Sequence, residues 1–174
     1  MALPKRKTMR YKGFDYSQFG AYFLTICTHN KENLFWDMDN VYKRTLKNEF
    51  DNIIDSENLP LTELGKVVER NIENLKNVYV NMQLVDYVIM PNHVHLLIAI
   101  MIDENNPCEK NPNISNIVSQ FKSKITKEIG QSIWQKNFYD HIIRNEKEFD
   151  NCIDYIDSNP RALELKILEK RKNK

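Results

Sequence analysis

Two histidines, His93 and His95, lie in the apolar run of residues 87–98 with one residue between them. Side chains alternate along a β-strand, so residues i and i+2 share a face with Cα atoms about 6.5 Å apart. Both imidazoles can then reach one metal ion. The alternate apolar side chains point the other way, into a core: Val94, Leu96 and Ile98. The spacing fits metal ligands, and it equally fits surface or packing histidines.

The chain is 174 residues long and 41% hydrophobic, which suits one folded domain spanning residues 1–174. Its three cysteines, Cys27, Cys108 and Cys152, are widely spaced and form no CxxC pair, which argues against a disulfide framework or a zinc–thiolate site. No apolar run approaches 18 residues, and no apolar segment follows the basic start. We therefore expect a cytoplasmic protein without a membrane partner.

Positive and negative charges nearly cancel, with 25 Lys and Arg against 24 Asp and Glu. Nucleic-acid binding would therefore need a local basic patch. One basic arm lies at about residues 1–16 and contains Lys5, Arg6, Arg10 and Lys12. A short basic tail begins at Lys166, and we expect its last residues to be solvated and frayed.

Hydrophobic periodicity predicts four strands and four main helices. The expected strands are 21–28, 83–90, 93–101 and 138–144, and the expected helices are 41–54, 62–78, 114–129 and 146–159. Thr62 is the expected cap of its helix, Gly130 the expected end of the third, and Pro160 the expected stop of the last. This order predicts an α+β fold, a ferredoxin-like βαββαβ sheet with an added C-terminal helix. We expect one of the first two helices to be the crossover from the first strand to the second, and the other to be an insertion.

The last helix has an apolar stripe formed by Phe149, Cys152, Ile153 and Ile156. Tyr155 lies beside this stripe, and Asn159 follows one turn later. A tyrosine in this position often packs on the core edge, and an Asn before a proline often ends a helix. Periodicity alone therefore assigns neither residue a chemical role.

Taken together, the motifs resemble one family. Residues 87–95 resemble the histidine–hydrophobe–histidine (HUH) strand of the single-tyrosine transposases, and residues 155–160 resemble their tyrosine helix, in the branch of REP-associated tyrosine transposases. Four further stretches resemble that branch: 10–16, 21–28, 121–123 and 139–144. The resemblance covers most of residues 10–162, whereas residues 41–58 look like an insertion.

The resemblance implies a ferredoxin-like sheet with both histidines on a central strand. It also implies a transposase that cleaves single-stranded DNA beside a REP-like or element-end hairpin, with Tyr155 as nucleophile. The products would be a 5′-phosphotyrosine and a free 3′-hydroxyl, without ATP. His93 and His95, with Asn159 as a less firm third ligand, would hold a divalent metal, Mg²⁺ or Mn²⁺.

Physical chemistry agrees with these roles. A phenol ordinarily titrates near pH 10 and is a weak nucleophile at pH 7, and the anionic phosphodiester repels attack. A divalent metal addresses the second problem. Two imidazoles and one amide make a weak site, so we expect the phosphate to complete the coordination and metal affinity to rise on DNA binding.

Other residues have weaker assignments. Lys122, Lys124 and Lys127 are candidate DNA contacts, as are the cations of the N-terminal arm, although all could simply be solvated. His141 is either an accessory group or a hydrogen-bonded structural histidine. The base that activates the tyrosine cannot be identified, because solvent and metal-bound hydroxide are both open.

Two rival functions stay open at this point. One is a catalytically silent protein of the same fold that only binds DNA hairpins. The other is a ferredoxin-like metal-binding domain without a nucleic-acid partner. The sequence also leaves open whether the protein is a monomer or a homodimer, whether the tyrosine serves its own histidines or a partner's, and whether the protein mobilises DNA or serves a host task.

Overall fold

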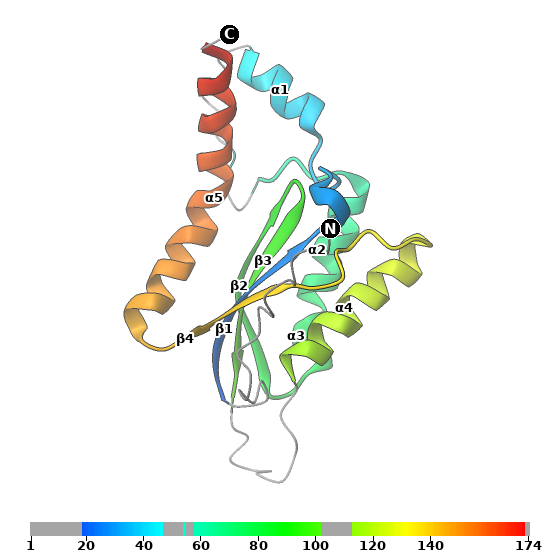
Figure 1. Cartoon of the computed structure of the whole chain (residues 1–174), viewed down its shortest axis with the longest axis vertical. Helices are drawn as coiled ribbons and strands as arrows, with labels where there is room; N and C mark the ends of the chain where they lie inside the picture. Colours follow the sequence, from blue (N-terminus) through cyan, green and yellow to red (C-terminus); the bar gives the residue numbers. More distant parts are fainter. Residues whose placement is uncertain (1–18, 47–53, 55–57, 102–112, 173–174) are drawn as a thin grey trace, which may run out of the picture.

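The computed structural model describes residues 19–46, 54, 58–101 and 113–172. Four strands, β1 to β4, and five helices, α1 to α5, are found there, together with one short 3-10 helix (Figure 1). None of the helices in these ranges has both the length and the apolar character needed to cross a membrane.

The four strands form one antiparallel sheet in the order β2-β3-β1-β4. Their bounds are β1 Gly20–Cys27, β2 Met82–Met90, β3 His93–Ile100 and β4 Tyr139–Ile143. This order and the intervening helices confirm the predicted ferredoxin-like α+β fold. The histidine strand β3 is central, between β2 and β1, as the resemblance implied.

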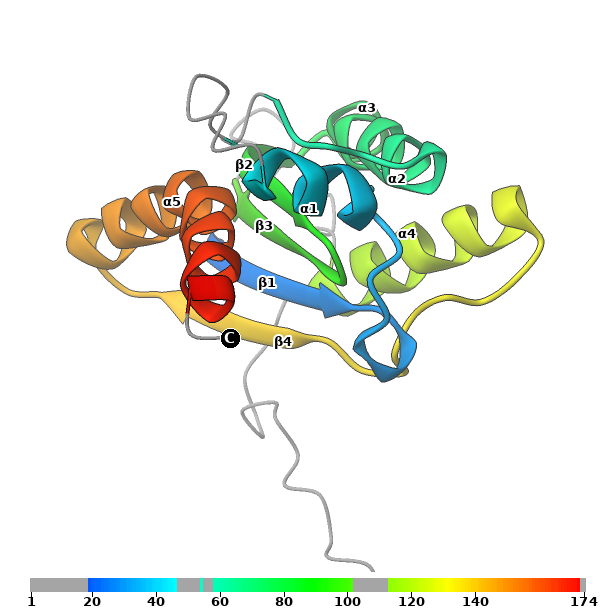
Figure 2. The same cartoon turned by 90° about the horizontal axis from the view of Figure 1, so that it is seen from above.

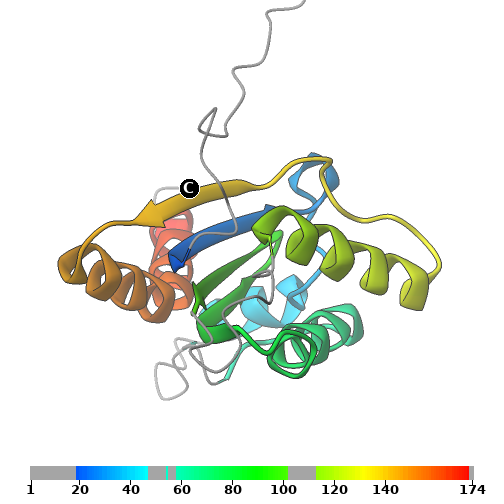
Figure 3. The ribbon, with the colours of Figure 1, turned by 90° about the horizontal axis from the view of Figure 1, so that it is seen from below.

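Helices cover the sheet on both sides. Figures 2 and 3 show α2 (Glu63–Glu73), α3 (Leu75–Val78) and α4 (Ile114–Ile129) on one side and the first half of α5 on the other. On the α2/α4 side, β1 and β3 present alternate, fully buried residues that form the core with the apolar stripes of these helices: Tyr22, Leu24 and Ile26 of β1, and Val94, Leu96 and Ile98 of β3. The opposite side of the sheet is only partly covered, which leaves room for a functional site.

Several helix ends match the sequence prediction. The Thr62 hydroxyl accepts a hydrogen bond from the Gly65 amide at 3.0 Å and caps α2. Gly130 ends α4 with φ +79°, a left-handed conformation that glycine adopts without strain. The predicted helix over residues 62–78 is divided at Asn74 into α2 and α3. Thus α2 is the crossover that covers the sheet.

The predicted helix over residues 41–54 is displaced. Helix α1 spans Met38–Leu46 and starts early because Asp37 accepts hydrogen bonds from the Asn40 and Val41 amides, through its side chain and its carbonyl respectively. Residues 47–53 lie outside the described part of the chain, and Ile54 is buried but not helical. Helix α1 lies beside the end of α5 (Figure 1).

The prediction that Pro160 ends the last helix was wrong. Helix α5 spans Glu146–Lys172 and contains Pro160 in its interior. Proline removes one backbone donor and its ring crowds the carbonyl four residues earlier, so it bends a helix that tertiary packing keeps intact. Figures 1 and 2 show the two halves of α5 running in different directions. The expected C-terminal tail is therefore helical through Lys172.

Hydrogen bonds from residues outside the hairpin stabilise the turn between β2 and β3. The Pro91 carbonyl accepts hydrogen bonds from the amides of Leu34 and Phe35 at 2.8 and 3.0 Å. Nearby, the buried Trp36 indole donates to the Ile89 carbonyl at 2.6 Å. These bonds fix the start of β3, and hence the position of His93.

Candidate functional site

The two histidines face α5 from the central strand. His93 pairs with Cys27 and Met90, and His95 pairs with Thr25 and Val88. Their rings lie 4.7 Å apart between centroids, with the Nε2 atoms 3.1 Å apart. The predicted convergence of the two imidazoles on one face of a strand is therefore present.

Burial keeps both imidazoles neutral. Burial, together with the smaller effect of the positive charge of Lys31, lowers the pKa of His93 to about 4. Burial also lowers the pKa of His95 to about 3, with a smaller contribution from His93. Neutral imidazole is the form that binds metal ions.

The outer nitrogen of each ring has an oxygen partner. His93 Nδ1 lies 2.7 Å from Asn92 Oδ1, and His95 Nδ1 lies 2.9 Å from Thr25 Oγ1. If each Nδ1–H donates to its oxygen, both Nε2 lone pairs point toward each other. Such an arrangement is repulsive unless a cation lies between them, and oxygen partners of this kind orient the histidine ligands of metal sites.

Tyr155 of α5 lies beside this pair in the same chain. Its ring centroid is 5.3 Å from that of His95 and 5.9 Å from that of Phe23, which stacks on His95 at 5.0 Å. The Tyr155 side chain packs against the sheet with its ring edge, yet the residue is 49% exposed. Half of the residue is thus exposed, while its ring is positioned next to the histidines.

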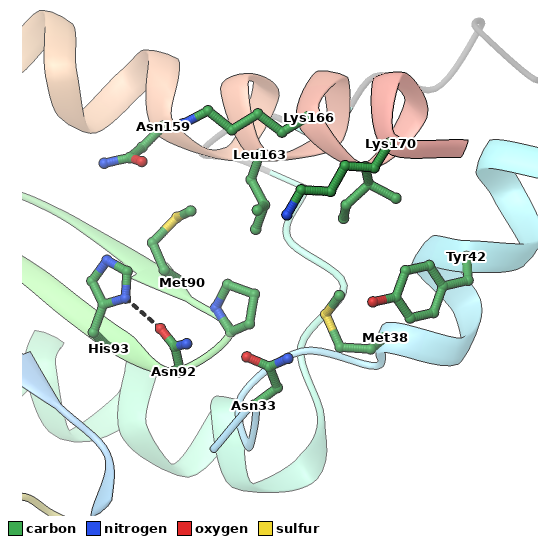
Figure 4. A pocket seen from close by; sticks show the side chains of 12 residues that line it. Asn33, Met38, Tyr42, Met90, Asn92, His93, Asn159, Leu163, Lys166 and Lys170 are labelled. Atoms are coloured by element: carbon green, nitrogen blue, oxygen red, sulfur yellow. Dashed lines mark hydrogen bonds between the residues drawn. The ribbon is translucent and has the colours of Figure 1, made fainter. Parts of the chain in front are cut away.

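Asn159 follows Tyr155 by one helical turn. It lines the same pocket as His93, facing it from α5 across the pocket (Figure 4). Its Nδ2 is buried and has no hydrogen-bond partner among the described residues. A half-turn of the amide would present Oδ1, a possible metal ligand, at the same place.

Within the described ranges, no three or more His, Cys, Asp or Glu side chains are grouped as metal ligands. Any metal site here would use the two imidazoles and an amide oxygen. The two Nε2 atoms are 3.1 Å apart. Two nitrogen ligands that are each roughly 2.2 Å from one ion, with a right angle between the two bonds, are separated by the same distance. This donor set fits a six-coordinate divalent cation that takes its remaining ligands from water or substrate.

Comparison with known proteins reveals several relatives. No protein-family model matches the chain. An uncharacterized protein of Haemophilus influenzae is 30% identical over an alignment 174 residues long. The alignment covers 89% of this chain and 88% of that protein. A putative REP-associated tyrosine transposase of the same organism is 32% identical over 83 residues, 41% of this chain and 46% of the relative.

A REP-associated tyrosine transposase of Escherichia coli is 31% identical over 75 residues, covering 42% of this chain and 41% of the relative. The match to each of these two transposases thus spans less than half of its length. A REP-associated tyrosine transposase of known structure shares the fold, with a TM-score of 0.56 and 20% identity over 87% of this chain and 72% of that one. This chain belongs to the REP-associated tyrosine transposase family.

In this family member the predicted basic contacts are dispersed. The Lys122 ammonium donates to the carbonyls of Gln135 and Asn137 at 2.8 and 3.0 Å, so it holds a loop. Lys124 and Lys127 lie on α4, on the side of the sheet away from Tyr155. The arm residues Lys5, Arg6, Arg10 and Lys12 lie outside the described part of the chain.

His141 belongs to β4, one strand removed from the histidine pair. It pairs with Phe23 across the sheet, and its Nε2 lies 3.3 Å from Glu148 Oε2 of α5. The neighbouring Arg144 amide also donates to Glu148 and lowers the pKa of this carboxyl, with His141 adding to the effect. These contacts fit the structural alternative for His141, as a residue that ties β4 to the start of α5.

Sequence reasoning missed three cations. Lys31 is the last residue of the short 3-10 helix His29–Lys31 after β1; it has a left-handed conformation with φ 58°, and its positive charge lowers the pKa of His93. Left-handed backbone at non-glycine residues is uncommon and is concentrated at functional sites. Lys166 and Lys170 line the pocket beside His93 because α5 continues past Pro160. Their i, i+4 spacing is visible in the sequence, but the predicted stop at Pro160 placed them in a basic tail beyond the last helix.

Proposed function

We propose that the protein is a metal-dependent endonuclease and strand transferase that cleaves single-stranded DNA next to a hairpin. Residues 1–174 would act as one nuclease domain with Tyr155 as the nucleophile. The main support is the close approach of the Tyr155 and His95 rings, 5.3 Å between centroids, in a member of a transposase family. A second support is that the structurally similar transposase is bound to a REP hairpin.

One chain is sufficient for this proposal. His93, His95 and Tyr155 approach one another without a second subunit, since the first half of α5 packs on the histidine face of the same sheet. The site therefore requires no exchange of the tyrosine helix between protomers.

In the proposed cleavage, one phosphorus–oxygen bond forms and one breaks. The Tyr155 hydroxyl oxygen attacks the phosphorus and forms a phosphotyrosine ester, while the bond from phosphorus to the 3′-oxygen breaks. The phenolic proton leaves the nucleophile, and the departing 3′-oxygen takes up a proton to become a free hydroxyl. The 5′-phosphate stays on Tyr155, so the reverse reaction rejoins DNA without an external energy source.

His93, His95 and Asn159 would hold Mg²⁺ or Mn²⁺ in this reaction. The cation supplies polarisation of the phosphate and offsets its charge. The protein's own contribution is orientation: Asn92 and Thr25 hold the imidazoles, and packing on Phe23 and His95 holds the Tyr155 ring. Lys31, whose charge is felt at His93, would add a fixed positive charge near the phosphate.

The test is a covalent adduct assay. The full-length protein is incubated with single-stranded hairpin oligonucleotides and Mn²⁺, and the products are separated on a denaturing gel. We expect an adduct with the wild type and none with Tyr155→Phe, which should retain hairpin binding because only the hydroxyl is removed.

Tyr139→Phe is the matched control. Tyr139 is 44% exposed, lies on β4 and pairs with Thr25, so it is an exposed tyrosine of the sheet near the site. Its variant should form the adduct normally. An adduct that survives in Tyr155→Phe would disprove the nucleophile assignment. Hairpin binding by the wild type without any adduct would favour the catalytically silent alternative.

A further inference from the structure

A pocket of about 700 Å³ extends from the candidate site toward the end of α5 (Figure 4). It lies between α1, the second half of α5 and the β2–β3 turn. His93 and Asn159 form part of its wall, so it is continuous with the proposed metal site. Two of the elements that form it are absent from the βαββαβ core, namely α1 and the part of α5 beyond Pro160.

The lining of the pocket is cationic and polar at some points and apolar at others. Lys166 and Lys170 occupy successive turns of one face of α5, and no Asp or Glu is found among the described residues that line the pocket. Figure 4 shows the Lys166 ammonium extending toward Asn159 and the Lys170 ammonium toward the interior. Two amides, Asn33 and Asn92, contribute donors and acceptors.

The apolar part of the lining offers an aromatic side chain on which the ring of a nucleotide base can stack. Tyr42 of α1 directs its side chain into the pocket opposite Lys170 (Figure 4). Met38, Met90 and Leu163 provide the rest of the apolar lining. Positive charge beside an aromatic ring and flexible thioethers is the combination that binds unpaired nucleotides, because phosphates pair with cations while bases stack on rings.

Resting on the proposed function, we propose that this pocket binds the unpaired nucleotides that adjoin the scissile phosphate. Lys166 and Lys170 contact their backbone phosphates, and Tyr42 stacks on a base. The strand thus runs from the histidine pair into the pocket, and α1 with the second half of α5 determines which strand next to the hairpin is held. This assigns a substrate-binding role to Tyr42, which belongs to the segment of residues 41–58 that resembled an insertion.

The experiment measures DNA affinity in a Tyr155→Phe background, in which no cleavage is expected. Three hairpins are compared: one without an extension, one with a four-nucleotide single-stranded extension on the cleaved side, and one whose extension is abasic. We expect the extended hairpin to bind more tightly than the blunt one. Lys166→Gln/Lys170→Gln should weaken binding of both extended hairpins roughly tenfold and leave the blunt hairpin unchanged.

The salt dependence and the aromatic variant give independent readouts. Loss of two phosphate contacts should reduce the slope of log K against log salt by about 1.4 for the extended hairpins, at roughly 0.7 per single-strand phosphate. Tyr42→Ala should weaken binding of the extended hairpin by roughly tenfold and have no effect with the abasic extension. Lys66→Gln/Lys76→Gln is the charge-matched control, on α2 and α3 at the far side of the sheet, and should change none of these values.

Three outcomes overturn the proposal: equal binding of blunt and extended hairpins, an equal loss for both in the Lys166/Lys170 variant, or no loss at all. Failure of the proposed function is distinguishable. In that case the wild type forms no adduct, while the extension-dependent affinity and its loss in the lysine variant persist.

Discussion

Thr25→Val tests whether the oxygen partner of His95 matters to the proposed metal site. Valine has nearly the same shape as threonine and suits a strand, so the variant should fold while losing the hydroxyl that lies 2.9 Å from His95 Nδ1. Removing such an outer partner typically costs 10- to 100-fold in metal affinity. A backbone hydrogen bond with Leu24 also supports this ring, so we expect the lower end, about tenfold, which is about 1.4 kcal/mol.

The assay is adduct formation on a hairpin oligonucleotide as a function of Mn²⁺ concentration. The Mn²⁺ midpoint should rise about tenfold, and the rate at saturating Mn²⁺ should stay close to that of the wild type, since the nucleophile is untouched. Thr126→Val on α4, remote from the histidine face, is the control and should leave the midpoint unchanged. An unchanged midpoint for Thr25→Val would refute the reasoning, as would a loss of rate that excess Mn²⁺ cannot restore.

Three further changes have defined outcomes. Asn159→Asp replaces an amide by a carboxylate, the better ligand for a hard cation, so Mg²⁺ binding without DNA should tighten in a calorimetric titration; weaker binding would remove Asn159 from the ligand set. Trp36→Phe leaves the buried Ile89 carbonyl without its indole donor, and urea unfolding should show a loss of about 1–3 kcal/mol. Gly65→Ala would push a methyl group into the Phe35 carbonyl oxygen, so the free energy of unfolding should fall by roughly 1–3 kcal/mol, and an unchanged value would contradict the close packing of α2.

The sequence by itself predicted the strands of the sheet and the positions of four candidate site residues, although the roles of Tyr155 and Asn159 came only from the family resemblance. Strand alternation brought His93 and His95 to one face, and helical spacing put Tyr155 beside the apolar stripe of α5. The helix caps at Thr62 and Gly130 were also predicted correctly from the sequence. These signals are local: each depends on side-chain chemistry within a few residues, so a single chain is enough to read them.

Only the tertiary structure decided how these parts meet. The proximity of Tyr155 to His95 depends on α5 returning over the histidine face, a contact between residues 60 positions apart in the sequence. Pro160 was misread for a related reason: local preference ends a helix at proline, whereas packing maintained α5 through Lys172 and brought Lys166 and Lys170 to the pocket. Long-range packing can outweigh a local cost of about 3 kcal/mol, and no local pattern records it.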